Sequence, residues 1–223
     1  GKNCPYGGRS RDEIEAFAIE AVERLVEEGV KMVVVGCNTA TTAAVDELRR
    51  RWPDMPIVGL EPAVKPACLT TATRRIAVLA TEHSLRSDMF LATARRYSAD
   101  VEVLKVVGEG FVELVEHDME HSAEARTMVD RVVRPLLSTG IDKIVLGCTH
   151  YPFLRPLIEQ IVAGHDIEVI DSGEAVARRA KWLLERYDIA ADATNIATMR
   201  YLTFADEAYR IRLEHKAERI MNE

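Results

Sequence analysis

Two cysteines stand out because each ends the same short pattern. Cys37 closes the segment G-V-K-M-V-V-V-G-C at residues 29–37, and Cys148 closes G-I-D-K-I-V-L-G-C at residues 140–148. The two segments align without gaps, 111 residues apart in a chain of 223 residues. A repeat at half the chain length predicts two similar halves, each with one thiol in the same structural position.

The position predicted for each thiol favours acid–base chemistry. Each cysteine follows an aliphatic run and precedes a helical pattern, which predicts the carboxyl end of a strand, where parallel sheets bind ligands. N–H groups at the next helix favour the thiolate, so we expect both thiol pKa values to fall from about 8.5 toward neutrality. Two thiols facing across a cleft could remove a proton from one face of a carbon and deliver one to the other face. This chemistry inverts a stereocentre and requires no cofactor.

Polar residues beside the thiols could hold a small zwitterionic substrate. Asn38 and Thr39 follow the first thiol, and Thr149 and His150 follow the second. The alternatives are helix capping for the hydroxyl and amide groups and a structural role for the imidazole. The turn at residues 6–10, Y-G-G-R-S, offers backbone N–H groups to a carboxylate, or its glycines serve the turn alone.

Other arrangements explain less of the sequence. His117 and His121 have the spacing of two metal ligands on one helical face, but no third ligand is evident. Residues 108–110, G-E-G, lack the rest of a dinucleotide-binding motif, so we expect a turn. A Cys–His hydrolase site at residues 148–150 leaves the matching Cys37 without a role. We therefore predict neither a metal nor a cofactor.

The pattern along the chain predicts alternating strands and helices. A capping box at Ser10 and Glu13 begins a helix over about 11–28. Aliphatic runs predict buried strands at 30–35, 56–60, 76–80, 101–107, 141–146 and 167–170, with helices at 39–52, 83–97, 123–137 and 152–162. Residues 62–73 predict a linker or a crossing between domains. Short connections between alternating strands and helices are typical of parallel α/β sheets.

Composition excludes several functional classes. The chain has 29 Lys and Arg against 36 Asp and Glu, a net charge of −7, which argues against binding to nucleic acid. No apolar stretch approaches the ~18 residues of a membrane helix, and the first residues lack a secretory-signal pattern. The four cysteines lack C-x-x-C spacing, which predicts free thiols. We expect a cytoplasmic protein without a membrane partner.

Longer motifs around these residues resemble the aspartate/glutamate racemase superfamily, and its glutamate-specific members most of all. The resemblance covers about residues 3–180 in order. The matching motifs are P-Y-G at 5–7, G-C-N-T-A at 36–40, P-I-V-G with E-P at 56–62, F-V and L-V-E within 111–116, and G-C-T-H-Y-P at 147–152. The two cysteine motifs at this separation make the resemblance specific.

The resemblance implies two similar parallel-sheet α/β lobes with the active site in the cleft between them. We predict one lobe from residues 1–65 with 180–223 and the other from residues 73–178. Cys37 and Cys148 would be the acid/base pair of a cofactor-independent glutamate racemization that supplies D-glutamate to peptidoglycan. The implied substrate contacts are Tyr6, Gly7, Asn38, Thr39, Thr149 and His150. The superfamily also implies a homodimer.

Three further residues could support the site. Ser84 takes the place of a threonine in a segment that resembles the family's A-T-x-x-T. Glu116 and Asp171 are acids near the ends of predicted elements, so either could hold an ammonium group or tune a histidine.

One departure from the family concerns the start of the chain. Family members begin with a strand that ends in a substrate-binding Asp-Ser-Gly, and this sequence starts where their second element starts. We expect the working protein to carry that segment. The alternatives are a non-catalytic amino-acid-binding relative without it, and a racemase of the same superfamily that acts on aspartate or a related substrate.

Overall fold

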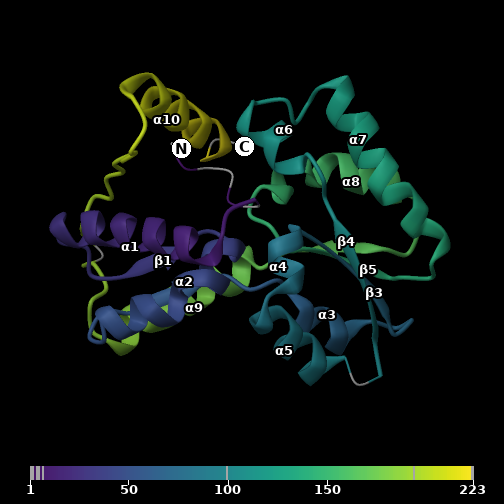
Figure 1. The fold of residues 1–223 in the computed structure, drawn as a ribbon, viewed down its shortest axis with the longest axis horizontal. Coiled ribbons are helices and arrows are strands. Elements are labelled where there is room, and N and C mark those ends of the chain that lie inside the picture. The colour runs from purple at the N-terminus through teal and green to yellow at the C-terminus, as the bar shows by residue number, and fades with distance from the viewer. Residues whose placement is uncertain (1–2, 4–5, 7, 99, 193, 222–223) are drawn as a thin grey trace.

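The structure is a computed structural model that describes residues 3, 6, 8–98, 100–192 and 194–221. Two parallel sheets, each with its own helices, form two lobes side by side (Figure 1). The predicted fold class, with two parallel-sheet α/β lobes, is confirmed. The residue limits predicted for the two domains remain a prediction.

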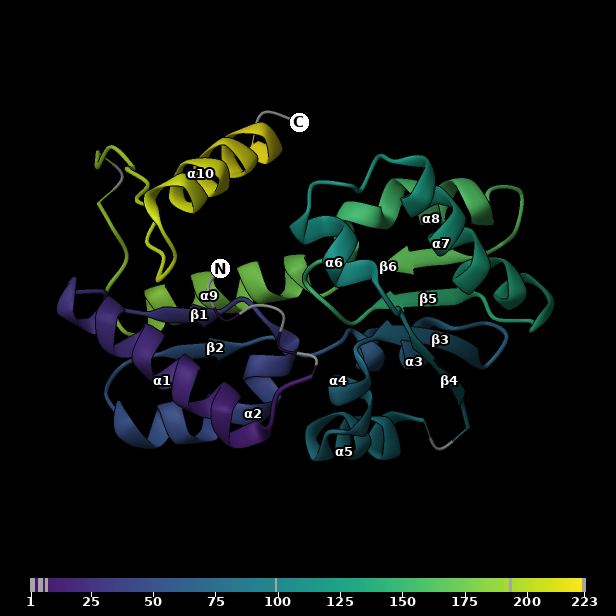
Figure 2. The same ribbon diagram turned by 45° about the horizontal axis from the view of Figure 1, so that its top comes forward.

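The first lobe is built on a pair of short parallel strands. Strand β1 (Val33–Val35) pairs with β2 (Ile57–Gly59). Helices α1 (Arg11–Glu27) and α2 (Asn38–Arg51) pack together on this sheet, and α9 (Gly173–Arg186) returns to contact β2 (Figure 2). The predicted capping box begins α1, because the Ser10 hydroxyl accepts from the Glu13 N–H while the Glu13 carboxylate accepts from the Ser10 N–H.

The second lobe has four parallel strands in the order β4-β3-β5-β6. They are β3 (Arg75–Ala80), β4 (Glu102–Val107), β5 (Lys143–Leu146) and β6 (Glu168–Ile170). Helices on one face are α3 (Val64–Thr70), α4 (Glu82–Arg86) and α5 (Asp88–Tyr97). Those on the other are α6 (Phe111–Glu116), α7 (Ala123–Val133) and α8 (Arg155–Val162), with 3-10 helices at Arg134–Ser138 and Tyr151–Leu154.

The central strand β3 explains why the strand patterns lack alternation. Ala77 and Leu79 pack into the core under α6, α7 and α8, whereas Ile76 and Val78 pack into the core under α3 and α5. Helices cover both faces of the sheet, so every position from 76 to 80 is buried and apolar.

Three predicted segments differ from the structure. The predicted linker at 62–73 contains helix α3, whose Val64 and Ala67 are fully buried in the second lobe. The predicted helix at 83–97 breaks at Ser87, whose hydroxyl caps α5 by accepting from the Phe90 N–H. The helix predicted over 123–137 tightens to 3-10 geometry at residue 134, followed by Pro135, which lacks an N–H donor. At residues 87 and 135, local capping and proline chemistry override the helical periodicity. The segment predicted as a linker is instead helical because its apolar side chains pack into the core of the second lobe.

The internal repeat is visible in the backbone. Gly29 and Gly140 open the two copies, with φ values of +77° and +76° in the left-handed region that favours glycine. Each copy continues into a strand, and each cysteine lies two residues beyond the last residue of β1 or β5. The predicted placement of both thiols at the carboxyl ends of equivalent strands is confirmed.

The chain ends in a helix that returns toward the second lobe. After an irregular segment over residues 187–192 and 194–206, α10 (Glu207–Met221) runs across the top of the molecule and reaches α6 (Figure 1). An ion pair of 2.8 Å between Arg200 and Glu28 ties the irregular segment to the end of α1. Within the part of the chain that the structure describes, no helix has the length and apolar character needed to cross a membrane.

Candidate active site

Both thiols line one cavity of about 370 Å³ that is formed by residues of both lobes. The predicted site residues that line it are Tyr6, Cys37, Thr39, Glu116, Cys148, Thr149 and His150. Gly7 lies outside the described residues. Because the two cysteines come from equivalent strand ends of two facing lobes, the cavity has one thiol from each half of the repeat.

Cys37 is the N-cap residue of helix α2. Its Sγ accepts from the Ala40 N–H at 3.4 Å, which is the helix-terminal contact that the sequence predicts. Burial raises the pKa of the Cys37 thiol, and the N–H groups of Ala40 and Thr39 with the Thr39 hydroxyl offset only part of that effect. The thiol is therefore protonated at neutral pH.

Cys148 lies in the turn between β5 and the 3-10 helix at Tyr151–Leu154 and is 9% exposed. Burial raises the pKa of this thiol to about 12. The N–H groups of His150 and Tyr151 lower it in part, and a charge on Cys37, present only when that thiol is ionised, raises it. The expected fall of both thiol pKa values toward neutrality is wrong. The helix-terminal N–H groups are present as predicted, but removing the thiol from water outweighs them.

An imidazole–carboxylate pair stands beside the second thiol. The Sγ of Cys148 is 3.7 Å from Nδ1 of His150, and Nε2 of His150 is 2.7 Å from Oε1 of Glu116. The turn that follows strand β5 supplies the imidazole, and the last residue of α6 supplies the carboxylate. This arrangement allows His150 to take the Cys148 proton while Glu116 holds the imidazole in position.

Three hydroxyl groups stand on the other side, next to Cys37. The Thr39 hydroxyl is 3.2 Å from that of Thr81 and 3.2 Å from that of Ser84, and Thr81 donates to Ser84 at 3.0 Å. Ser84 is 1% exposed and does not line the cavity, so it acts there through Thr39 and Thr81, which do. This hydroxyl cluster joins the start of α2 in the first lobe to the start of α4 in the second.

Two more predicted contacts belong to the first lobe: Tyr6 lines the cavity, whereas Asn38 is not among its lining residues. Asn38 is 3% exposed, and its Nδ2 has no hydrogen-bond partner among the described residues. A buried amide without a partner is a donor available to a ligand. The ring of Tyr6 stacks on Phe17 of α1, with 6.4 Å between centroids.

The turn predicted at residues 108–110 is confirmed, and it also lines the cavity. Gly108 has to be a glycine, because a Cβ there would lie 2.5 Å from Oη of Tyr151, which donates to the Gly108 carbonyl at 3.1 Å. The G-E-G motif by itself predicted no part for this turn in the site. The glycine pair directly after a strand is the signal that could have placed it there.

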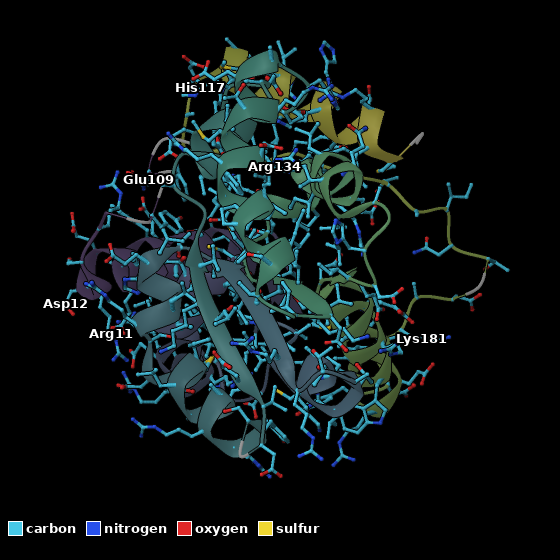
Figure 3. All side chains as sticks on the ribbon, turned by 90° about the vertical axis from the view of Figure 1, so that its right-hand side faces the viewer. Arg11, Asp12, Glu109, His117, Arg134 and Lys181 are labelled. Atoms are coloured by element: carbon cyan, nitrogen blue, oxygen red, sulfur yellow. The ribbon has the colours of Figure 1, made fainter. Side chains whose placement is uncertain are left out.

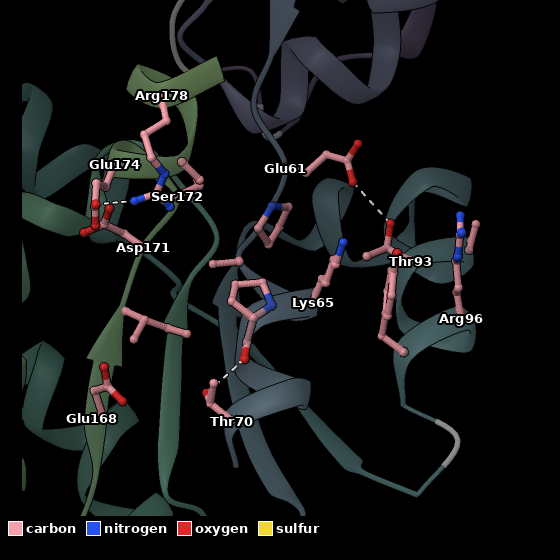
Figure 4. A pocket seen from close by; sticks show the side chains of 17 residues that line it. Glu61, Lys65, Thr70, Thr93, Arg96, Glu168, Asp171, Ser172, Glu174 and Arg178 are labelled. Atoms are coloured by element: carbon pink, nitrogen blue, oxygen red, sulfur yellow. Dashed lines mark hydrogen bonds and ion pairs between the residues drawn. The ribbon is translucent and has the colours of Figure 1, made fainter. Parts of the chain in front are cut away.

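Other candidates lie elsewhere. Asp171 accepts from Arg155 at 2.9 Å and from the Gly173 N–H, and it lines a separate, larger cavity near Arg178 (Figure 4). It does not reach the thiols, so its suggested role there is wrong. His117 is exposed at the edge of the molecule (Figure 3), with Nδ1 2.8 Å from the Glu113 carbonyl oxygen. Across the described ranges no three His, Cys, Asp or Glu side chains gather as a metal site.

Comparisons with known proteins identify the family to which the chain belongs. Residues 2–180 match the model of the Asp/Glu/hydantoin racemase family. A glutamate racemase of Herpetosiphon aurantiacus is 44% identical over 207 residues, which cover 93% of this chain and 81% of the relative.

Solved structures agree with the fold. A glutamate racemase isoform from Bacillus anthracis superimposes with a TM-score of 0.85 at 30% identity, covering 100% of this chain and 82% of its own. The Escherichia coli glutamate racemase, solved with L-glutamate and the activator UDP-MurNAc-ala, gives a TM-score of 0.82 at 29% identity, covering 96% and 81% of the two chains. The similarity extends over both lobes.

Proposed function

Because the chain belongs to the Asp/Glu/hydantoin racemase family, we propose that it interconverts L- and D-glutamate by proton transfer between two thiols. The observation that carries this proposal is the shared cavity, in which Cys37 and Cys148 come from equivalent positions of two facing lobes. Two acid/base groups on opposite sides of one carbon are what inversion by deprotonation and reprotonation requires.

Each step of the proposed reaction balances its protons. His150 accepts the Cys148 proton, and the thiolate then removes the α-proton of glutamate. The C–H electron pair remains on the α-carbon, and the Cys37 thiol donates its proton to the opposite face. The products are the other enantiomer, a Cys148 thiol, a Cys37 thiolate and the His150 imidazolium. The reverse reaction starts from this state and restores the first one.

The raised thiol pKa values favour one step of this chemistry and oppose another. A thiolate whose conjugate thiol has a high pKa is a strong base, as the weakly acidic α-proton requires. The same shift keeps both thiols protonated at neutral pH, so a proton has to leave before catalysis begins. The His150–Glu116 pair provides an acceptor for the Cys148 proton.

The remaining polar residues are proposed to bind the substrate. A cavity of about 370 Å³ is within the size range of small-molecule sites. We assign the carboxylates and ammonium of glutamate to donors and acceptors of Tyr6, Gly7, Asn38, Thr39, Thr149 and His150. The unpartnered Asn38 amide supports this assignment, because a bound carboxylate would complete its hydrogen bonding.

The wider setting is proposed from the family as well. We propose a cytoplasmic homodimer whose D-glutamate enters peptidoglycan. Light scattering coupled to size-exclusion chromatography tests the assembly, and a single species at the monomer mass contradicts it.

The test of the activity is α-proton exchange in heavy water. We expect loss of the α-proton NMR signal from L- and D-glutamate, each with appearance of the other enantiomer, and much slower exchange with aspartate. Exchange of the α-proton of aspartate but not of glutamate would identify aspartate as the substrate in place of glutamate. Binding of glutamate without any exchange would make the protein a non-catalytic amino-acid-binding relative and overturn the proposal.

A further inference from the structure

The C-terminal helix α10 contacts the carboxylate that supports Cys148. The Tyr209 hydroxyl donates to Oε2 of Glu116 at 3.4 Å, while Oε1 of the same carboxylate faces Nε2 of His150. Each oxygen of Glu116 therefore has a partner on a different element. A carboxylate held at both oxygens has less freedom to rotate away from the imidazole than one held at a single oxygen.

A lysine of α10 fixes the end of the short helix that carries Glu116. The Lys216 ammonium donates to the Val115 carbonyl at 2.6 Å and to the Asp118 carboxylate at 2.8 Å, and lies 5.2 Å from the ring centroid of Phe153. The Lys216 side chain is only 16% exposed. Lys216 adds a second hydrogen bond to a carbonyl that already accepts from the Asp118 N–H, and a cation at a helix C-terminus interacts favourably with the helix dipole. Lys216 therefore stabilises α6 at the turn where Glu116 stands.

A second ion pair extends the contact. Arg219 donates to Glu120 at 3.1 Å, and the Glu120 carboxylate is 2% exposed and also lies 3.7 Å from the Lys216 ammonium. Three residues of α10, at positions 209, 216 and 219, thus contact the segment from Val115 to Glu120. A helix without a buried residue of its own is held there mainly by polar contacts.

We propose that α10 positions the active site and that Tyr209 is a positioning residue that holds Glu116 against His150. Tyr209 does not line the thiol cavity, so it acts on the substrate only through the pair. A small cavity of about 150 Å³ between Tyr209, Glu116, His150 and the α10 residues lies on the other side of that pair. This inference rests on the proposed racemization, because its readout is proton transfer by Cys148.

The test is the variant Tyr209→Phe, which removes one hydroxyl and keeps the ring. The matched control is Tyr201→Phe, the same chemical change at a hydroxyl that contacts Met199 in the irregular segment. We expect kcat/KM for glutamate to fall about threefold to tenfold in Tyr209→Phe, the range that one ordinary hydrogen bond supplies, and to stay unchanged in the control. The thermal unfolding midpoints of the two variants should agree.

A double-mutant cycle separates positioning from a structural role. If Tyr209 acts through Glu116, the loss caused by Tyr209→Phe disappears in a Glu116→Gln background. A second readout is the α-deuterium isotope effect on kcat/KM. It should rise for the enantiomer that Cys148 deprotonates and fall for the other, because only the Cys148 step becomes slower.

A second variant tests the helix as a whole. Lys216→Met keeps the aliphatic chain and removes the contacts to Val115 and Asp118, and we expect it to lower kcat/KM with the same isotope signature. Unchanged kcat/KM in Tyr209→Phe, or a loss that persists in the Glu116→Gln background, overturns the inference while the parent protein remains active. A parent protein without glutamate exchange instead overturns the proposed function.

Discussion

The two thiols occupy the same place in the repeat but have different surroundings. Cys37 begins a long α-helix, and its neighbours are backbone N–H groups and hydroxyls. Cys148 lies in the turn before a short 3-10 helix, and its neighbours are the His150 imidazole and, behind it, the Glu116 carboxylate. The strand ends are equivalent, but the chemical support of the thiols is not.

This difference shows what an internal repeat fixes and what it leaves open. The backbone that places a thiol at a strand end is duplicated, down to the left-handed glycine before each strand. The residues one and two positions after each thiol are not duplicated, and they decide which groups can receive or share its proton. Two thiols in equivalent backbone positions can thus depend on different neighbouring residues. Substitutions beside Cys37 and beside Cys148 should therefore affect different steps of the reaction.

Removing either thiol should have the largest effect. Cys37→Ala and Cys148→Ala each delete one of the two groups that carry the proton. We therefore expect the rate of glutamate racemization, measured by circular dichroism, to fall at least about a thousandfold. The control is Cys68→Ala, a buried thiol in α3 outside the cavity, which should keep its turnover. Normal turnover in a folded Cys37→Ala protein would show that the cavity works without a thiol pair.

Alkaline unfolding should reveal the buried state of Cys148. Its pKa is about 12 in the folded protein and about 8.5 in an unfolded chain, so folding retains the proton between these values. The contribution of this thiol to the free energy of unfolding is complete below pH 8.5 and is lost as the pH rises toward 12. The loss amounts to up to a few kcal/mol, at about 1.36 kcal/mol per pKa unit. Urea unfolding at pH 8 and 10.5 measures it.

The matched variant for that experiment is Cys148→Ser, in which a hydroxyl that does not titrate in this range replaces the thiol. The free energy of unfolding should fall less between the two pH values in the variant than in the parent. Equal slopes would mean that the Cys148 thiol already ionises in the folded protein near its ordinary pKa.

Glu116→Gln should weaken the Cys148 side alone. The amide keeps the shape of the side chain but cannot balance an imidazolium. We expect kcat/KM to fall about tenfold to a hundredfold, less than the roughly 10²- to 10⁴-fold that a general acid or base itself contributes, because Glu116 acts through His150. The α-deuterium isotope effect should rise for one enantiomer and fall for the other. Equal changes for both enantiomers would mean that Glu116 serves both thiols.

Ser84→Ala should give the smallest effect, on the opposite side. It removes a hydroxyl that contacts Thr39 and Thr81, so we expect a loss of about twofold to fivefold in kcat/KM, as for one weak hydrogen bond. Its isotope effects should shift in the sense opposite to those of Glu116→Gln. Ser138→Ala, at an exposed hydroxyl that donates to the Pro135 carbonyl, is the control.

The local sequence was sufficient to predict much of the fold and the centre of the site. The aliphatic run, the glycine before it and the Gly-Cys pair after it are all short-range features. They therefore predict both strands and both thiol positions without knowledge of the distant residues that pack against them. The capping box at Ser10 and Glu13 is equally local, and it is found where it was predicted. The resemblance to the racemases added the cleft between the lobes and a list of substrate contacts.

Other features depend on residues that are distant in sequence, and only the tertiary structure decided them. The direction of the thiol pKa shifts follows from burial, which both lobes create together around Cys37 and Cys148. The contact of Tyr209 with Glu116 joins positions 93 residues apart, and no local pattern encodes such a pair. The sequence by itself determined which groups could move a proton. Packing between distant segments decided how strongly each group holds its proton, because solvation and charge depend on all neighbours in space.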